Sequence, residues 1–164
     1  MTLGSMSPSN REPGRLVVLC GLPGSGKTTL AKRMASDSGA IRLCPDEWMT
    51  ALEVDLWDNE ARARVEALQW QLAQDLLAAG ATVVIEWGVW SRAERDLVRE
   101  RAHELGASVE LHYLDVPIDE LWTRVRNREV PNPPIQRSDL EQWSHVIEAP
   151  GPDEIQLYDE PPAG

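Results

Sequence analysis

Phenylalanine is absent from this 164-residue chain and lysine nearly so, occurring only at positions 27 and 32. The 27 acidic residues outnumber the 16 lysines and arginines and give a net charge of −11. Proteins that grip a nucleic-acid backbone usually carry a basic face, so this composition argues against a nucleic-acid partner. Because arginine supplies nearly all of the positive charge, the positions of the arginines become informative.

Cysteine, histidine and long apolar runs are also scarce. Cys20 and Cys44 lie at the ends of two predicted strands, and we expect a third strand between these two, so a disulfide is not expected and a reducing cytoplasm fits. The three histidines lack the paired spacing of a metal site. No apolar run approaches the roughly 20 residues of a membrane span, so no membrane partner is expected.

The N-terminal segment is polar and rich in Ser, Pro and Gly, without the basic region and apolar core of a signal peptide. We expect residues 1–14 to form a disordered leader. The length of the chain suits one domain with a sizeable core, which we place at residues 15–164. These features together predict a cytoplasmic location. The oligomeric state has no signal in the sequence.

The strongest motif is a glycine-rich loop that fits the pattern G-x-x-x-x-G-K-[ST] in full. It follows an apolar run and opens a helix-like segment, which is the context the motif needs. The loop consists of Gly21, Leu22, Pro23, Gly24, Ser25, Gly26, Lys27 and Thr28. Such a loop points backbone N–H groups at a phosphate, and the following helix adds a partial positive charge.

This loop, extended to Thr29, predicts a nucleoside triphosphate site. Lys27 can reach the β- and γ-phosphates, and the hydroxyl of Thr28 can ligate Mg²⁺. The absence of an Asn-Lys-x-Asp guanine motif favours ATP over GTP. ATP and Mg²⁺ are therefore the predicted cofactors.

Strands and helices alternate along the rest of the chain. This alternation predicts an α/β fold with a five-stranded, mostly parallel sheet. The P-loop, and the likeness to P-loop kinases that it carries, imply the three-layer α/β/α P-loop NTPase fold with the strand order 2-3-1-4-5. The strands are expected at residues 15–20, 40–44, 81–85, 108–114 and 155–158. The helices are expected at residues 28–38, 59–79, 92–105, 118–128 and 138–148.

The apolar spacing of two helices predicts which face each one buries. For the longest helix, the predicted face is Ala61, Val65, Leu68, Leu72 and Leu76. For the helix over 92–105, it is Ala93, Leu97, Ala102 and Leu105. Ser138 is expected to cap the last helix, with Glu141 completing a capping box.

Sites in parallel sheets lie beyond the carboxyl ends of the strands, where two acidic residues stand out. Asp46 follows the second strand and can accept the proton of an attacking hydroxyl, or it can simply cap a short helix. Glu47 is an alternative base. Glu86 ends the central strand, where it can hold Mg²⁺, contact the acceptor or serve a structural role.

Residues near Glu86 are candidates for contacts with the acceptor. Trp87 follows it directly, and Arg92 opens the next helix as either an acceptor contact or a solvated surface residue. Four tryptophans flank the proposed acceptor pocket and either stack on a flat substrate or fill the core. These tryptophans are Trp48, Trp57, Trp87 and Trp90.

A helix, a proline-rich loop and a second helix over residues 124–138 have the layout of a lid. Arg124 and Arg128 are four residues apart and share a helix face, so both are candidates for stabilising a transferring phosphoryl group. The alternative is that these cations only complement the helix dipole.

Together these motifs resemble the kinase domain of polynucleotide kinases and the small P-loop kinases grouped with them, including zeta-toxin-like and chloramphenicol phosphotransferase-like proteins. The resemblance covers roughly residues 17–148 and rests on the P-loop, Asp46, the Ser91–Arg95 stretch, Leu114–Pro117 and the arginine-rich helix. It implies ATP as donor, a hydroxyl as acceptor, Asp46 as general base and Arg124 and Arg128 as lid arginines.

The chain departs from the polynucleotide enzymes where Glu86-Trp87-Gly88 replaces an Asp followed by small polar residues, and it lacks a basic entry channel. We therefore predict an ATP-dependent kinase that phosphorylates a hydroxyl of a small molecule, such as a nucleoside, a sugar or an antibiotic. A 5′-hydroxyl polynucleotide kinase and a P-loop ATPase or nucleotide-binding module without kinase activity stay open.

Overall fold

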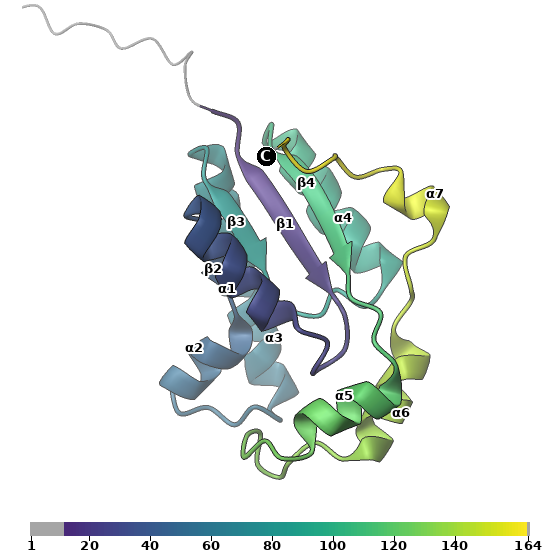
Figure 1. The fold of residues 1–164 in the computed structure, drawn as a ribbon. Helices are drawn as coiled ribbons and strands as arrows, with labels where there is room; N and C mark the ends of the chain where they lie inside the picture. Colours follow the sequence, from purple (N-terminus) through teal and green to yellow (C-terminus); the bar gives the residue numbers. More distant parts are fainter. Residues whose placement is uncertain (1–11, 164) are drawn as a thin grey trace, which may run out of the picture.

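The computed structural model describes residues 12–163, so residues 1–11 of the predicted leader lie outside the described residues. Within 12–163, four parallel strands form one sheet in the order β2-β3-β1-β4 (Figure 1). The strands are β1 (Arg15–Cys20), β2 (Ile41–Leu43), β3 (Thr82–Ile85) and β4 (Ser108–Tyr113). The α/β class and the predicted order of the first four strands are confirmed.

Helices connect and follow the strands. They are α1 (Lys27–Ser38), α2 (Pro45–Ala51), α3 (Asn59–Ala78), α4 (Arg92–Glu104), α5 (Ile118–Val125), α6 (Arg137–Val146) and α7 (Pro152–Ile155). The carboxyl ends of the strands point toward the end of the molecule where α2, α5 and α6 lie (Figure 1). In the described part of the chain, no helix has both the length and the apolar character needed to cross a membrane.

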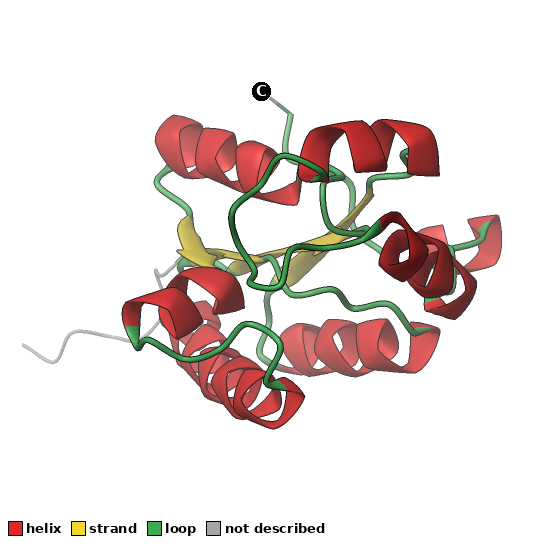
Figure 2. Ribbon diagram, turned by 90° about the horizontal axis from the view of Figure 1, so that it is seen from below, coloured by secondary structure: helices red, strands yellow, loops and turns green. Residues whose placement is uncertain are grey.

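The sheet lies between helices on both faces, which gives the three α/β/α layers (Figure 2). Successive side chains of a strand point to opposite faces, so β1 contributes to two cores. Val17 and Leu19 pack with α1. Leu16 and Val18 pack with buried residues of α3 and α4. A third apolar cluster joins the P-loop residue Leu22 to α5 and α6.

The predicted fifth strand is wrong. Within residues 12–163 the sheet has four strands, and the segment predicted as the last strand contains the end of α7 and a turn instead. Pro152 begins α7, because its fixed φ suits the first turn of a helix. The segment still reaches the sheet edge, where the N–H of Asp159 donates to the carbonyl of Val109 at 2.8 Å.

The lid helices also differ in their bounds. The helix predicted to reach Arg128 ends at Val125, so Arg128 lies beyond it. The cap of α6 is Gln136 rather than Ser138, and Asp139 completes the capping box. Gln is not a favoured N-cap residue and Ser is, which is why the pattern placed the cap two residues late.

The predicted buried faces of α3 and α4 are wrong in part. Leu68 and Leu97 are 60% and 65% exposed. The buried residues of α3 are Ala61, Val65, Gln69, Ala73 and Leu77, and those of α4 are Arg95, Val98 and Ala102. Each buried face thus contains a polar residue, Gln69 in α3 and Arg95 in α4. A prediction from apolar spacing alone leaves such residues out.

Candidate active site

The P-loop turns between β1 and α1. Gly24 and Gly26 have φ of 84° and 100°, a conformation that glycine adopts at little cost. A Cβ on Gly24 would lie 2.7 Å from Cγ1 of Val125, so this position also needs the small residue for contact with α5. The hydroxyl of Ser25 is buried without a hydrogen-bond partner inside the loop. The loop thus presents an unpaired polar group as well as its N–H groups.

Lys27 lies folded back over the loop. Its Nζ donates to the carbonyl oxygens of Gly21 at 2.7 Å and Leu22 at 3.1 Å. Burial lowers the pKa of Lys27 to about 8, although the charges of Cys20, Asp46 and Glu86, among its neighbours, oppose this shift. Both predicted carboxylates therefore act on the ammonium group of the P-loop lysine.

Glu86 follows β3 and is buried, with 6% of its surface exposed. Its Oε2 lies 2.8 Å from Nη2 of Arg42, but neither of its oxygens makes a hydrogen bond of good geometry. Burial raises the pKa of Glu86, and the hydroxyl of Thr28 and the guanidinium of Arg42 partly oppose that shift. Thr28 and Glu86 are thus neighbours, as a shared Mg²⁺ site requires.

Asp46 lies in the first turn of α2, directly after β2. It is not the N-cap of this helix, a position held by Cys44. Its exposed carboxylate pairs with Nη2 of Arg62 from α3 at 2.7 Å. The neighbouring Glu47 pairs instead with Arg42 at 3.0 Å. Each of the two candidate bases therefore has its own arginine partner.

Negative charge gathers on the α3 side of Asp46. Burial raises the pKa of Glu66, and the charges of Glu94 and Asp46 add to this shift, while Arg62 opposes it. These carboxylates lie close enough to interact through their charges. A polyanionic acceptor would be repelled at this end of the sheet.

A cavity of about 590 Å³, which we name the P-loop recess, lies on the other side of the loop. Nη1 of Arg124 donates to the carbonyl of Gly24 at 2.9 Å. Nη2 of the same guanidinium pairs with the carboxylate of Glu120. The recess is lined by Gly24, Ser25, Gly26, Thr29, Leu30, Arg33, Leu114, Arg124 and Arg128. The fold therefore brings both predicted lid arginines to the P-loop, together with Arg33, which the sequence did not single out.

The loop between α5 and α6 is tied to the acceptor side of the molecule. Nε1 of Trp57, in the segment between α2 and α3, donates to the carbonyl of Pro133 at 2.8 Å. The ring of Trp57 also lies 6.1 Å from that of Trp143 on α6. The predicted lid thus contacts the segment that follows Asp46 and α2.

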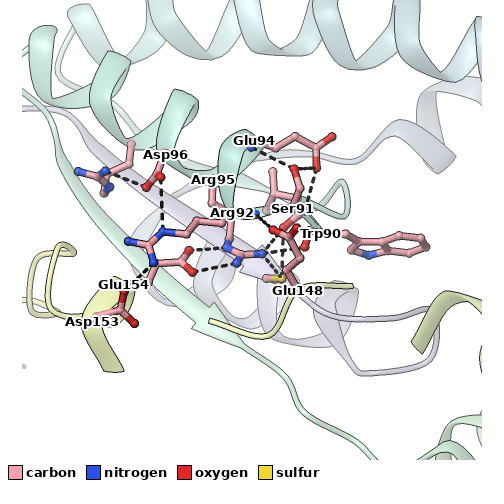
Figure 3. A network of polar contacts seen from close by, with 12 residues as sticks. Trp90, Ser91, Arg92, Glu94, Arg95, Asp96, Glu148, Asp153 and Glu154 are labelled. Carbon is pink, nitrogen blue, oxygen red and sulfur yellow. Dashed lines mark hydrogen bonds and ion pairs between the residues drawn. The ribbon is translucent and has the colours of Figure 1, made fainter. Parts of the chain in front are cut away.

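Two residues that were predicted to contact the acceptor instead contact other parts of the protein. Trp87 is 8% exposed and packs in the main core. The guanidinium of Arg92 pairs with Asp153 at 2.6 Å and with Asp96 at 3.6 Å, on the side of α7 (Figure 3). Acceptor contacts by these two residues stay predictions, and neither is needed for the chemistry proposed below.

Sequence reasoning missed the arginines that hold the two carboxylates. Arg42 lies within a short strand and Arg62 within a long helix, and neither belongs to a motif. Their partners Glu86 and Asp46 lie 44 and 16 residues away along the chain. Only the packing of α3 and β2 around the strand ends brings these charges together.

The residues present fit a nucleotide with Mg²⁺. The orphaned hydroxyl of Ser25, the N–H groups of the loop and the helix start at Lys27 suit phosphate oxygens. Among the described residues there is no group of three His, Cys, Asp or Glu side chains that could hold a metal alone. Mg²⁺ usually keeps waters and substrate phosphates as most of its ligands, so the hydroxyl of Thr28 and the carboxylate of Glu86 could suffice to hold it.

Known structures and families resemble this chain. A sugar kinase from Janibacter sp. HTCC2649, in its unliganded form, is 28% identical, with a TM-score of 0.62 over 87% of this chain and 82% of that one. A chain of the Pnkp1/Rnl/Hen1 RNA repair complex is 24% identical, with a TM-score of 0.69, over 91% of this chain but 46% of that one. The APS kinase CysC of Mycobacterium tuberculosis, in complex with AMPPNP and APS, is 24% identical, with a TM-score of 0.57, over 71% and 70% of the two chains.

The second and third of these likenesses show the fold alone. No curated protein matches the sequence at a significant level. Residues 16–150 match the AAA domain family, a span that includes the P-loop, both carboxylates and the lid arginines. The predicted resemblance to the small P-loop kinases is confirmed, and this chain belongs to the AAA domain family.

Proposed function

We propose that this protein is an ATP-dependent kinase that transfers the γ-phosphoryl group to a hydroxyl of a small molecule. One observation carries the proposal: a complete P-loop after β1, Asp46 after β2 and Glu86 after β3 lie at the carboxyl ends of adjacent parallel strands. A phosphate-binding lysine, a candidate base and a candidate metal carboxylate at one point are the parts that phosphoryl transfer uses.

The donor side is built from the P-loop and the recess beside it. Residues 21–29 would hold the phosphates through N–H groups, Lys27 and the two threonine hydroxyls. Thr28 and Glu86 would hold Mg²⁺, directly or through water. Mg²⁺ held there would neutralise part of the charge of the triphosphate. The P-loop recess, at about 590 Å³, has room for the rest of a nucleotide.

The transfer itself depends on residues from both sides of the sheet. Asp46 accepts the proton of the attacking hydroxyl, once its pairing with Arg62 has loosened. Lys27 and the lid arginines Arg124 and Arg128 stabilise the negative charge on the transferring group. Positioning and electrostatics supply most of the catalysis, as in other phosphoryl transfers.

The charges around Asp46 support a neutral or cationic small acceptor. Glu66 lies within the range of the charges of both Asp46 and Glu94, and the whole chain carries a net charge of −11. Such a field attracts cations and repels a nucleic-acid backbone. The likeness to a sugar kinase at 28% identity also supports a small hydroxylated acceptor.

The test of the proposal is ADP release from Mg²⁺·ATP with a panel of sugars, nucleosides, hydroxylated antibiotics and 5′-hydroxyl oligonucleotides. Stimulation by one small-molecule class, with the phosphorylated product seen by mass spectrometry, is the expected result. Stimulation by oligonucleotides alone, falling steeply with salt, would favour the polynucleotide kinase. ADP release that no acceptor changes would contradict the proposal and favour an ATPase.

Replacement of Arg128 by Ala is expected to lower kcat about 10- to 100-fold, because a charge-assisted hydrogen bond to the transferring group is lost. Arg128 lines the P-loop recess, whereas the nearby Arg126 does not. Arg126→Ala is therefore the matched control and should keep kcat within about twofold. Equal losses in both variants would mean that general positive charge, and not the position of Arg128, matters.

A further inference from the structure

Helix α3 carries a second apolar stripe, beside the residues that it buries in the core. Leu68 and Leu72 lie four residues apart, so they are neighbours on one side of the helix. They are 60% and 38% exposed. A single exposed leucine is common on protein surfaces, whereas neighbouring ones form a patch that another surface can cover.

This stripe faces away from α4. Gln74 marks the α4 side of the helix, because its side chain accepts from Nε of Arg101 on α4 at 2.8 Å. Leu72 lies two residues before Gln74, which is about 160° around the helix and therefore on the opposite side. The sheet has the order β2-β3-β1-β4, with α3 packed against β3 and α4 against β4. The side of α3 that faces away from α4 therefore lies toward β2, at the edge of the sheet.

The strand at this edge adds to the apolar surface. Ile41, the first residue of β2, is 39% exposed. Leu43, two residues further on, packs in the core with α3, and alternation along a strand puts Ile41 on the same face of the sheet. We name Ile41, Leu68 and Leu72 the edge patch.

Charges of opposite sign lie at the two ends of the stripe on α3. Arg64 lies four residues before Leu68, and Asp75 lies three residues after Leu72, on the same side of the helix. Both are exposed, and neither makes an ion pair within residues 12–163. The midpoint between the two charges and the midpoint between the two leucines agree to within about one residue, or about 1.5 Å along the helix.

This symmetry fits one partner, which is a second copy of the same chain. When two α3 helices pack antiparallel about a two-fold axis at that midpoint, Arg64 of each copy faces Asp75 of the other. In the same register, Leu68 of each copy packs beside Leu72 of the other. A parallel pair would instead bring like charges together. We propose that the edge patch is the interface of a homodimer in which the two α3 helices lie antiparallel.

The patch predicts a dimer of moderate strength. It offers only a few apolar side chains, whereas obligate dimers bury large apolar surfaces, and two chains of net charge −11 repel one another. We expect a Kd of about 1–100 μM at about 0.15 M salt, where screening reduces this repulsion. Because each side chain occurs twice in a two-fold interface, each substitution acts twice.

The first test is sedimentation velocity of the ligand-free protein over concentrations that span this Kd. The wild-type protein should pass from monomer to dimer as its concentration rises. Leu68→Gln combined with Leu72→Gln should weaken the dimer at least about 100-fold, because the apolar contacts are lost from both copies. The control is Leu97→Gln, which removes an exposed leucine of α4 outside the patch. It should dimerise as the wild-type protein does.

A charge exchange tests the antiparallel alignment. Arg64→Asp and Asp75→Arg should each weaken the dimer about tenfold, because like charges then meet at both ends of the interface. When the two variants are mixed, they should form heterodimers more readily than either variant dimerises alone, since both pairs again have opposite signs. The double variant should recover the wild-type dimer. All of these side chains are exposed, so the variants should fold.

Three results would overturn the proposal. The first is a wild-type protein that stays monomeric over the whole range, and the second is a dimer that the exchange of both leucines leaves intact. The third is a mixture of the two charge variants that associates no better than each variant alone. The measurements use the protein without nucleotide or acceptor, so their outcome is independent of the proposed kinase activity.

Discussion

Replacement of Asp46 by Asn is expected to lower kcat by about 100- to 10,000-fold, the range that loss of a general base produces. The amide has nearly the same shape but cannot take a proton from the acceptor hydroxyl. The Kd for ATP should stay within about twofold, because Asp46 serves the acceptor and not the phosphates. The measurement is the steady-state rate with the acceptor found in the panel, beside a calorimetric titration of ATP.

Two control variants separate the base from its surroundings. Arg62→Ala breaks the 2.7 Å ion pair with Asp46 but keeps the carboxylate, so its kcat should fall far less than that of Asp46→Asn. Glu47→Gln tests the alternative base, whose carboxylate pairs with Arg42. A large loss in Glu47→Gln with little change in Asp46→Asn would move the role to Glu47. Parallel loss of turnover and ATP affinity in Asp46→Asn would contradict any role as base.

The positions of the strands were predictable because the chain encodes each strand locally. β1 and β3 are short, mostly apolar runs, whereas β2 and β4 also contain the polar residues Arg42, Glu110 and His112. Parallel strands joined by helices allow few topologies, and the P-loop after β1 selects among them. The last segment failed because its residues suit a strand or a helix equally well over so short a length. Pro152 favours the start of a helix, and the ion pair between Arg95 and Glu154 then stabilises α7.

The buried faces of α3 and α4 were not predictable in full from apolar spacing. Gln69 is fully buried on α3, and Arg95 is fully buried on α4. Arg95 is tolerated there because Glu154 neutralises it from a segment 59 residues away. A prediction from apolar spacing places polar residues in solvent. It therefore assigned Leu68 and Leu97 to the buried faces, although both leucines are exposed.

The candidate site also has a part that the sequence predicts and a part that it does not predict. The P-loop is a continuous motif whose backbone performs the binding, so eight residues suffice to recognise it. The ion pairs of Asp46 and Glu86 with Arg62 and Arg42 join separate elements and leave no pattern in the sequence.

Replacement of Lys27 by Ala is expected to lower kcat/KM for ATP by about 100- to 1,000-fold, the cost of removing one donor that stabilises charge in the transition state. The chain offers a matched control, because its other lysine, Lys32, lies exposed on the same helix. Lys32→Ala should retain the wild-type rate. Unchanged turnover in Lys27→Ala would refute the role of the P-loop lysine.

The pH dependence of ATP binding tests the same residue by a different route. Burial lowers the pKa of Lys27 to about 8 in the free protein. Bound phosphates favour the protonated ammonium and raise this pKa, so binding takes up a proton once the pH exceeds about 8. Affinity should then fall as the pH rises above that value, by up to about tenfold per pH unit. The decline should be absent in Lys27→Ala and unchanged in Lys32→Ala, and an equal slope in all three proteins would assign the proton to another group.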